Sequence, residues 1–433
     1  MQPNNTIKKV MTGVLATSII AAPFALTPVN VLAQPQTTPN GPYVELEQNV
    51  SLSSFMTNEE LFERLQQLEE QSKGKMELDI AGYSNEGSPL YVAKYGDNDP
   101  NKKKLLIYTQ IHGNEPLGTE AVVELMQKFN SGGQEINELL DQVSVWIMPR
   151  VNPDGTMTEY EGEQYPVRYS HQEWNPEALG LAPDTSAPWY YNEGTERAQG
   201  NNGRIDYGIP GYDLNRDFHP NFNFDITKED PAKVEAILNN PETNNIWNTG
   251  FLVSPEAKAV TSVVQEFEPD AVIDVHHRGF NPLSEEDDRS VSISVLGQFT
   301  TVPYTDPFTG KVYEIDEDVL ELSKQMTVVA YESLQRGYSS FGAIQQYPQV
   351  NYPGSGLGAI QLNGAATTLI EVKGQTQTLG QKQSGMLKET VKTPIYEIMK
   401  ALADGSIRDV DASLYEDIPP AYGGIGDPST RDF

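Results

Sequence analysis

Histidine is scarce in this chain, and two histidines stand where metal chemistry could arise. The five are His112, His171, His219, His276 and His277. His112 begins the stretch His-Gly-Asn-Glu, so Glu115 follows it by three residues, and a tight turn would let both side chains reach one cation. With His276 the set becomes two histidines and one glutamate, a known catalytic zinc set that leaves a fourth position open for water. Because a lone His-x-x-Glu is also common in exposed turns, the metal site is a hypothesis that its surroundings must support.

Both candidate ligands follow short apolar runs of the kind that form buried strands. Residues 104–111 (KLLIYTQI) precede His112, and residues 271–275 (AVIDV) precede His276. Functional side chains of α/β proteins gather past the carboxyl ends of parallel strands, so the two histidines are expected at one edge of a sheet. His277 should point to the opposite face and not share the metal, because successive strand residues alternate.

Apolar periodicity predicts the remaining elements. Strands are expected at 76–82, 89–95, 143–151 and 366–372. Helices are expected after the capping box of Thr57 and Glu60, and at 118–129, 255–267, 316–336 and 385–404. Buried strands that alternate with helices predict an α/β protein with a largely parallel sheet.

Composition narrows the function classes. The 433 residues carry a formal net charge of −31, and such an acidic chain repels nucleic acid and anionic membrane surfaces, so neither is an expected partner. There is no cysteine, which excludes disulfides, thiol catalysis and cysteine-bound zinc. Any metal must therefore be held by His, Asp or Glu side chains.

The ends of the chain differ in composition from its middle. Residues 1–33 combine Lys8 and Lys9 with an apolar stretch and short residues up to Ala33, which predicts a cleaved export signal and a secreted protein. Residues 34–54 are expected to be a linker, 55–404 the catalytic domain, and 405–433 a loosely packed tail. Residues 156–205 lack periodicity and predict a surface insertion.

Four further motifs accompany the histidines. Asn152-Pro153-Asp154-Gly155 follows one predicted strand, Asp213-Leu214-Asn215-Arg216 comes later, Asp274-Val275-His276 ends another strand, and Glu371 ends the last. In this order they resemble the zinc carboxypeptidase family, whose best-known member is carboxypeptidase A. The resemblance covers roughly residues 55–400 and implies the family's fold: a mixed, largely parallel central sheet of about eight strands with helices on both faces.

The resemblance also implies roles. One zinc ion would be held by His112, Glu115 and His276, and Glu371 would be the general base that takes a proton from water. Asp213 would orient a zinc-bound histidine through its free ring N–H, although it could equally cap a turn.

Recognition of the substrate follows the same resemblance. Asn215 and Arg216 match the pair that binds the free C-terminal carboxylate, and a guanidinium suits that task because it can donate two parallel hydrogen bonds. Tyr352 resembles the family's mobile tyrosine, with Tyr347 as the rival. The small Ala359 falls near the residue that lines the side-chain pocket, where it would not select basic residues.

A second arginine, which stabilises the developing oxyanion in this family, should lie between the Asn-Pro-Asp-Gly and Asp-Leu-Asn-Arg motifs. Arg168, Arg197 and Arg204 all fall in that interval. Arg204 is preferred because it is closest to the second motif.

Two other readings remain open. A cell-wall peptide hydrolase of the same family, cleaving a γ-D-glutamyl–diaminopimelate type of bond, would use the same motifs. A non-catalytic binding module would keep the fold alone. The expected partner is a peptide or protein with a free C-terminus, acted on by a monomer. His171 and His219 are expected to be surface or insertion residues, and the acidic run 284–290 is expected to be a solvated loop rather than a calcium site.

Overall fold

The computed structural model describes residues 55–422, with gaps at 97, 161, 165, 186–189, 192–209, 240–249, 279–282, 288, 290, 336–342, 349–350 and 374–379. The predicted export signal and the linker lie outside the described residues, as do Arg197 and Arg204. No described helix is both long enough and apolar enough to cross a bilayer.

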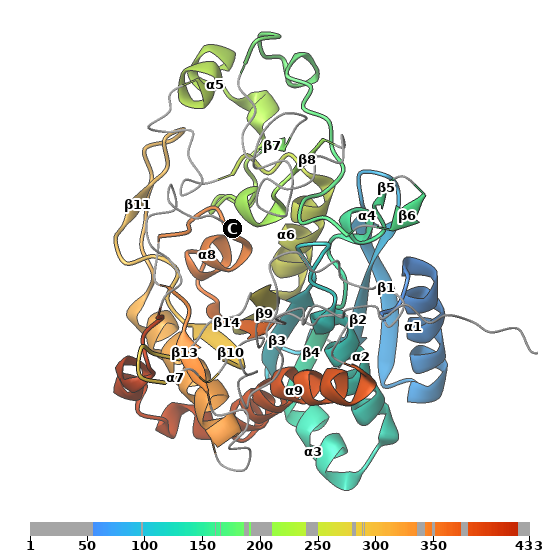
Figure 1. Ribbon diagram of the computed structural model, residues 1–433. Coiled ribbons are helices and arrows are strands. Elements are labelled where there is room, and N and C mark those ends of the chain that lie inside the picture. Colours follow the sequence, from blue (N-terminus) through green and yellow to red (C-terminus); the bar gives the residue numbers. More distant parts are fainter. Residues whose placement is uncertain are drawn as a thin grey trace, which may run out of the picture. The chain divides into compact units, whose positions relative to one another are not determined.

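A mixed sheet forms the centre of the fold, in the strand order β1-β2-β4-β3-β9-β14-β10-β13 (Figure 1). The strands are β1 (Met76–Tyr83), β2 (Pro89–Tyr95), β3 (Lys103–Thr109), β4 (Val143–Met148), β9 (Ala271–Arg278), β10 (Ile293–Leu296), β13 (Ile344–Gln346) and β14 (Ala366–Lys373). The pairs β4–β3, β3–β9, β9–β14 and β10–β13 are parallel, and β1–β2, β2–β4 and β14–β10 are antiparallel. The predicted mixed, largely parallel sheet of about eight strands is confirmed.

One side of the sheet, called here the helical face, is covered by long helices. They are α1 (Asn58–Ser72), α2 (Leu117–Ser131), α3 (Gln134–Gln142), α7 (Glu317–Gln335) and α9 (Gly380–Asp404). The apolar residues of these helices pack against every second residue of the strands, such as Leu105, Ile107 and Ile273, and form a single buried cluster with them. Helix α1 begins as predicted, because Glu60 N–H donates to Thr57 Oγ1 at 3.1 Å and Thr57 N–H donates to Glu60 Oε2 at 2.8 Å.

The other side, called here the catalytic face, is covered mainly by connections and short elements. Its helices are α4 (Pro153–Thr156), α5 (Pro231–Leu238), α6 (Pro255–Phe267) and α8 (Gly356–Gln361), and its two-residue strands are β5 (Glu159–Tyr160), β6 (Glu163–Gln164), β7 (Tyr190–Tyr191), β8 (Gly211–Tyr212), β11 (Tyr304–Thr305) and β12 (Val312–Tyr313). A second buried cluster holds the alternate strand residues, such as Leu106, Val272 and Leu369. Helices therefore cover both faces, as expected, although unequally.

Two expectations about packing are wrong. The tail after residue 404 is not loose as far as residue 418, because it forms the 3₁₀ turns η6 (Ser406–Asp409) and η7 (Ala412–Asp417) and buries Ile407, Tyr415 and Ile418 in the core of the helical face. His219 is not a surface residue: it is 1% exposed, and its ring stacks on Phe224 with the centroids 4.1 Å apart. Tertiary packing decides both cases, since each segment is short and carries no periodicity of its own.

Candidate active site

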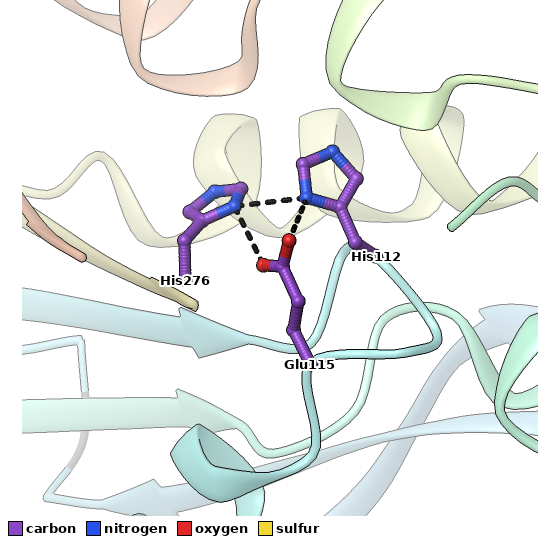
Figure 2. Close-up of side chains that lie close together, drawn as sticks. All are labelled: His112, Glu115 and His276. Carbon is purple, nitrogen blue, oxygen red and sulfur yellow. Dashed lines mark hydrogen bonds and ion pairs between the residues drawn. The ribbon is translucent and has the colours of Figure 1, made fainter. Parts of the chain in front are cut away.

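Three side chains converge at the carboxyl ends of β3 and β9 (Figure 2). His112 Nδ1 lies 3.0 Å from Glu115 Oε1 and 3.0 Å from His276 Nδ1, and His276 Nδ1 lies 3.1 Å from Glu115 Oε2. All three are buried, and among the described residues they are the one group of His, Asp or Glu side chains whose ligand atoms lie within 4.8 Å of one another. The structure thus brings together the three residues that the sequence singled out.

These atoms suit a zinc ion. Two imidazole nitrogens at normal zinc distances and tetrahedral angles lie about 3.3 Å apart, close to the separation found here, and a glutamate oxygen completes a set with an open fourth position. Although burial favours a neutral carboxyl, His112 and His276 hold the pKa of Glu115 well below its usual range. The Glu115 carboxylate is therefore ready as an anionic ligand.

Each histidine is backed by a carboxylate on the ring nitrogen that faces away from the cluster. His276 Nε2 lies 2.6 Å from Asp274 Oδ2, and His112 Nε2 lies 3.3 Å from Asp213 Oδ1. Asp274 and His276 are two residues apart on β9, so both side chains stand on the catalytic face. Such partners fix the ring orientation and raise the basicity of a metal-binding imidazole.

A strained turn carries His112 and Glu115. Gln110 adopts φ = 54°, a left-handed conformation that is costly for a residue with a side chain, and several contacts hold it there. Its Nε2 donates to the Gly113 carbonyl, and its Oε1 accepts from Arg150 Nε at 2.8 Å. Gly113 itself has no room for a Cβ, which would lie 2.3 Å from the Gly155 backbone. The turn therefore packs closely against the backbone of the Asn-Pro-Asp-Gly segment.

His277 points to the helical face, as predicted. Its Nε2 accepts the Leu117 N–H at 2.9 Å at the start of α2, and burial lowers its pKa to about 4, which keeps the ring neutral. Its backbone N–H donates to Glu115 Oε2 at 3.0 Å. His277 therefore steadies Glu115 and α2 without offering a ring nitrogen to the metal cluster.

Glu371 stands next to the cluster. It pairs in register with His276 on the neighbouring parallel strand, so the two side chains share the catalytic face, and it is 8% exposed. Burial raises its pKa to about 7, against the opposing effect of His276. A carboxyl whose pKa lies near neutrality is well placed to take up and release a proton.

Arg168 also reaches the cluster. Its Nε donates to Asp213 Oδ2 at 3.0 Å, and its Nη1 lies 3.1 Å from His112 Nδ1 and 3.6 Å from Glu115 Oε1. Its backbone carbonyl accepts from Gly113 N–H and from Asn152 Nδ2, which ties it to the strained turn. Burial opposes ionisation of Asp213, but Arg168 and His112 hold the pKa of that carboxyl well below its usual range.

Asn215 and Arg216 lie in the 3₁₀ turn η4 (Leu214–Arg216), directly after Asp213. Asn215 Oδ1 accepts the Gly356 N–H at 2.9 Å, which joins this turn to the start of α8. The Arg216 guanidinium lies over the Tyr352 ring, 4.9 Å from its centroid, and donates from Nη1 to the Asn215 carbonyl. The predicted carboxylate-binding pair and the predicted tyrosine are therefore neighbours.

Three further residues that the sequence analysis named do not contact the metal ligands in the interactions described here. Ala359 is fully buried in α8, a helix without charged residues. Tyr347 lies beneath Arg278 rather than Arg216. His171, expected to be a surface or insertion residue, is partly exposed; its ring contacts Thr158 within the 156–205 segment and Glu86 in the β1–β2 turn.

Two residues at the site were not assigned a role from the sequence. Asp274 had a detectable signal, because the Asp-x-His spacing on a strand places both side chains on one face. Arg278 repeats that spacing beyond His276, but the predicted strand ended at residue 275, so its position was not foreseen. Nothing in the sequence spacing favours Arg168 over the other arginines, and its location depends on the Gly113 and Asn152 contacts.

Comparison with known proteins agrees with this geometry. Residues 61–327, more than half of the chain, match the zinc carboxypeptidase family. Among curated proteins, the chain is 28% identical over 123 residues to a zinc carboxypeptidase of Saccharothrix mutabilis subsp. capreolus, which covers 27% of this chain and 28% of that protein. It is also 28% identical over 148 residues to the carboxypeptidase N catalytic chain of Homo sapiens, covering 31% and 32%. The matched part spans about a third or less of these relatives.

Solved structures show the same fold at low identity. Carboxypeptidase A of Helicoverpa armigera superimposes with a TM-score of 0.52 and 15% identity, covering 87% of this chain and 77% of that one. Bovine thrombin-activatable fibrinolysis inhibitor gives a TM-score of 0.51 at 14% identity, covering 81% and 98%. The family match and the converging His112, Glu115 and His276 lead to one conclusion: this chain belongs to the zinc carboxypeptidase family.

Proposed function

We propose that this protein is a zinc-dependent metallocarboxypeptidase that removes C-terminal residues from peptides or proteins. The observation that carries the proposal is the meeting of His112, Glu115 and His276 beside Glu371, with Asn215 and Arg216 close to the same cluster. The first three residues can bind a metal ion, Glu371 can transfer a proton, and Asn215 and Arg216 can bind the free end of a peptide.

The ligand set is His112, Glu115 and His276, and the ion is zinc. Zinc held there would polarise the scissile carbonyl and lower the pKa of a bound water. Asp213 and Asp274 keep the two rings aimed with their Nδ1 atoms toward the ion, because each carboxylate faces the opposite nitrogen of its ring.

Glu371 is proposed as the general base. Its carboxylate takes a proton from the attacking water and passes it to the leaving amine. Burial supports this role, since it raises the pKa of Glu371 toward neutrality, where the group can exchange protons in both directions. The flanking strands β9 and β10 keep its backbone rigid.

Substrate binding is assigned to Asn215 and Arg216, which would receive the C-terminal carboxylate through the amide and the guanidinium fork. Tyr352 would cover the bound residue, since its ring already lies against Arg216. The uncharged α8 offers no acid to a basic side chain, so we expect apolar or neutral leaving residues.

For the oxyanion we propose Arg168 in place of Arg204. The contacts of Arg168 with Asp213, His112 and Glu115 support this role, because they hold its guanidinium beside the metal ligands, from where it would donate to the scissile carbonyl oxygen. Arg204 lies outside the described residues, so its contribution is left to the mutational comparison given below.

One experiment tests the proposed function. The purified full chain is incubated with a mixed library of peptides with free C-termini and with the same library amidated, and the products are read by mass spectrometry. We expect stepwise loss from free C-termini, little loss from amidated ones, and abolition by a chelator with recovery on adding zinc. Equal cleavage of both libraries, or zinc-independent cleavage, would contradict the proposal.

The same assay distinguishes the two alternative functions. Cleavage of γ-D-glutamyl–diaminopimelate peptides in preference to ordinary peptides would make the protein a cell-wall peptide hydrolase, and absence of any hydrolysis by zinc-loaded protein would make it a binding module. The presence of Glu371 in register with His276, one of the three clustered ligands, supports an enzyme. Secretion through residues 1–33 and the monomeric state are kept as predictions.

A further inference from the structure

A second row of polar residues lies one step beyond the catalytic row on the same face of the sheet. In the first row, His276 of β9, Glu371 of β14 and Ser294 of β10 are in register. Two residues farther along β9 and β14, Arg278 is paired with Lys373. Because side chains two residues apart share a face, both cations point to the catalytic face, about 6.6 Å past the row of His276 and Glu371.

Arg278 is the member of this second row that substrate can reach. It is partly exposed, its Nη1 donates to Ser294 Oγ at 2.7 Å, and its guanidinium lies 5.4 Å from the centroid of the Tyr347 ring. Its positive charge also opposes the rise in the pKa of Glu371, which places it within electrostatic range of the general base. These contacts fix the guanidinium at the edge of the reaction centre.

Lys373 and Ser292 complete the surroundings. Lys373 is 3% exposed, and burial lowers its pKa to about 8. Ser292 accepts the Lys373 N–H through its carbonyl, and its hydroxyl is buried without a hydrogen-bond partner in the described structure. A chain with a formal net charge of −31 thus places two neighbouring cations and an unpaired hydroxyl beside its general base.

Arg278 and Lys373 belong to other elements than the proposed site for the C-terminal carboxylate, although Arg278 and Arg216 both lie within electrostatic range of Tyr347. Arg216 and Asn215 belong to η4 and contact α8 and Tyr352, whereas Arg278 and Lys373 end β9 and β14 and lie toward β10 and Tyr347. If Arg216 receives the carboxylate of the leaving residue, a carboxylate bound by Arg278 would be a second one. The remaining part of a bound peptide is the acyl side of the scissile bond.

We propose that Arg278, supported by the charge of Lys373, forms a subsite for a second substrate carboxylate on the acyl side of the scissile bond. This inference rests on the proposed function and names its substrate class: peptides that carry an acidic group next to the bond that is cleaved. That group is either the side chain of an acidic residue or the free α-carboxylate of a γ-linked glutamyl residue. A planar guanidinium binds either one through paired, charge-assisted hydrogen bonds.

Two matched peptide pairs test the subsite. The first pair shares its sequence and C-terminal residue and has Glu or Gln immediately before that residue. The second has a γ-linked glutamyl residue there, with its α-carboxylate either free or converted to an amide. We expect wild-type protein to prefer the carboxylate member of at least one pair by about tenfold or more in kcat/KM, and the preferred pair identifies the source of the carboxylate.

Variants assign the preference to the subsite. Arg278→Gln should bring the ratio within the preferred pair close to one, and Lys373→Gln should lower it in part. Arg64→Gln, on α1 at the far end of the sheet, is the matched control and should keep the wild-type ratio. As a readout independent of turnover, the dissociation constants of zinc-free wild-type and Arg278→Gln protein for the labelled carboxylate and amide peptides should show the same loss of discrimination.

The outcomes are separable. Wild-type protein that hydrolyses both members of both pairs equally overturns the subsite and leaves the carboxypeptidase proposal standing. So does an Arg278→Gln variant that loses activity equally on both members, since Arg278 would then act only through Glu371. Zinc-loaded protein that cleaves none of the peptides, or any library peptide, overturns the proposed function itself.

Discussion

The two faces of the central sheet use the same strands for different purposes. On the helical face, α1, α2, α3, α7 and α9 bury their apolar stripes in a continuous core. On the catalytic face, short elements and connections hold polar side chains at the ends of β3, β9 and β14. The comparison teaches that regular secondary structure supplies rigidity from one side, while irregular backbone on the other side brings distant residues together.

The largest expected effect belongs to the catalytic face. Glu371→Gln should lower kcat about a hundred- to ten-thousandfold, because the amide cannot take the proton of the attacking water. Zinc content, measured by elemental analysis, and the free energy of unfolding should stay close to wild type. Retained turnover would remove Glu371 from the reaction and weaken the distinction between the two faces.

The second-largest effect on kcat is expected from the comparison of Arg168 with Arg204. Arg168→Gln is expected to lower kcat about a hundred- to a thousandfold, since it removes a donor aimed at the developing oxyanion. Arg204→Gln serves as the matched variant and should change kcat far less. If Arg204→Gln has the larger effect, the original preference for Arg204 is right and Arg168 is a positioning residue for Asp213.

A buried acid on α6 predicts a pH effect on stability. Burial raises the pKa of Glu256, in the first turn of α6, to about 8, so the folded protein binds this proton more tightly than the unfolded chain. The contribution of Glu256 to stability is therefore present at pH below about 4.5 and is lost as pH rises to about 8. Glu256→Gln should gain stability relative to wild type across that window, as measured by urea denaturation at several pH values. A difference that does not change with pH would contradict the shift.

The two carboxylates that orient the histidine rings should affect the affinity for zinc rather than the stability of the fold. Asp274→Asn should weaken zinc affinity by about ten- to a hundredfold, because His276 loses the partner that orients its ring. Asp213→Asn, which acts on His112 at a longer distance, is the paired comparison and should have the smaller effect. Competition with a chromogenic chelator gives both values, and unchanged affinity in Asp274→Asn would show that β9 alone orients the ring.

The smallest expected effect lies on the helical face. Thr57→Ala removes the side-chain cap of α1 and should lower the free energy of unfolding by about 1 kcal/mol. The kcat of the variant should remain close to the wild-type value, because α1 packs on β1, and the strands β2, β4 and β3 lie between β1 and β9. A large loss of activity without a matching loss of stability would show that the two faces are more strongly coupled than proposed.

Features that depend on local sequence could be predicted, and features that depend on distant parts of the chain could not. The capping box of Thr57, the spacing of Leu61, Leu65 and Leu68, and the apolar run before His276 are local signals, and each predicted element formed. The burial of His219 and the packing of the tail were not predicted, because His219 lies against Asp306 and Phe308 and Tyr415 joins the core of the helical face, and these partners are far away in the chain. Sequence periodicity does not encode such partners.

The sequence alone determined the residue types available for chemistry: two strand-end histidines, a glutamate three residues from one of them, and no cysteine to compete for metal. It also determined the alternation of strands and helices, since hydrophobic periodicity is a local property. Only the tertiary structure decided that Arg168 reaches His112, that Asp213 lies behind His112, and that Arg278 stands beside Lys373. These contacts arise from strand register and from close backbone approach at Gly113, which appear only once distant segments pack together.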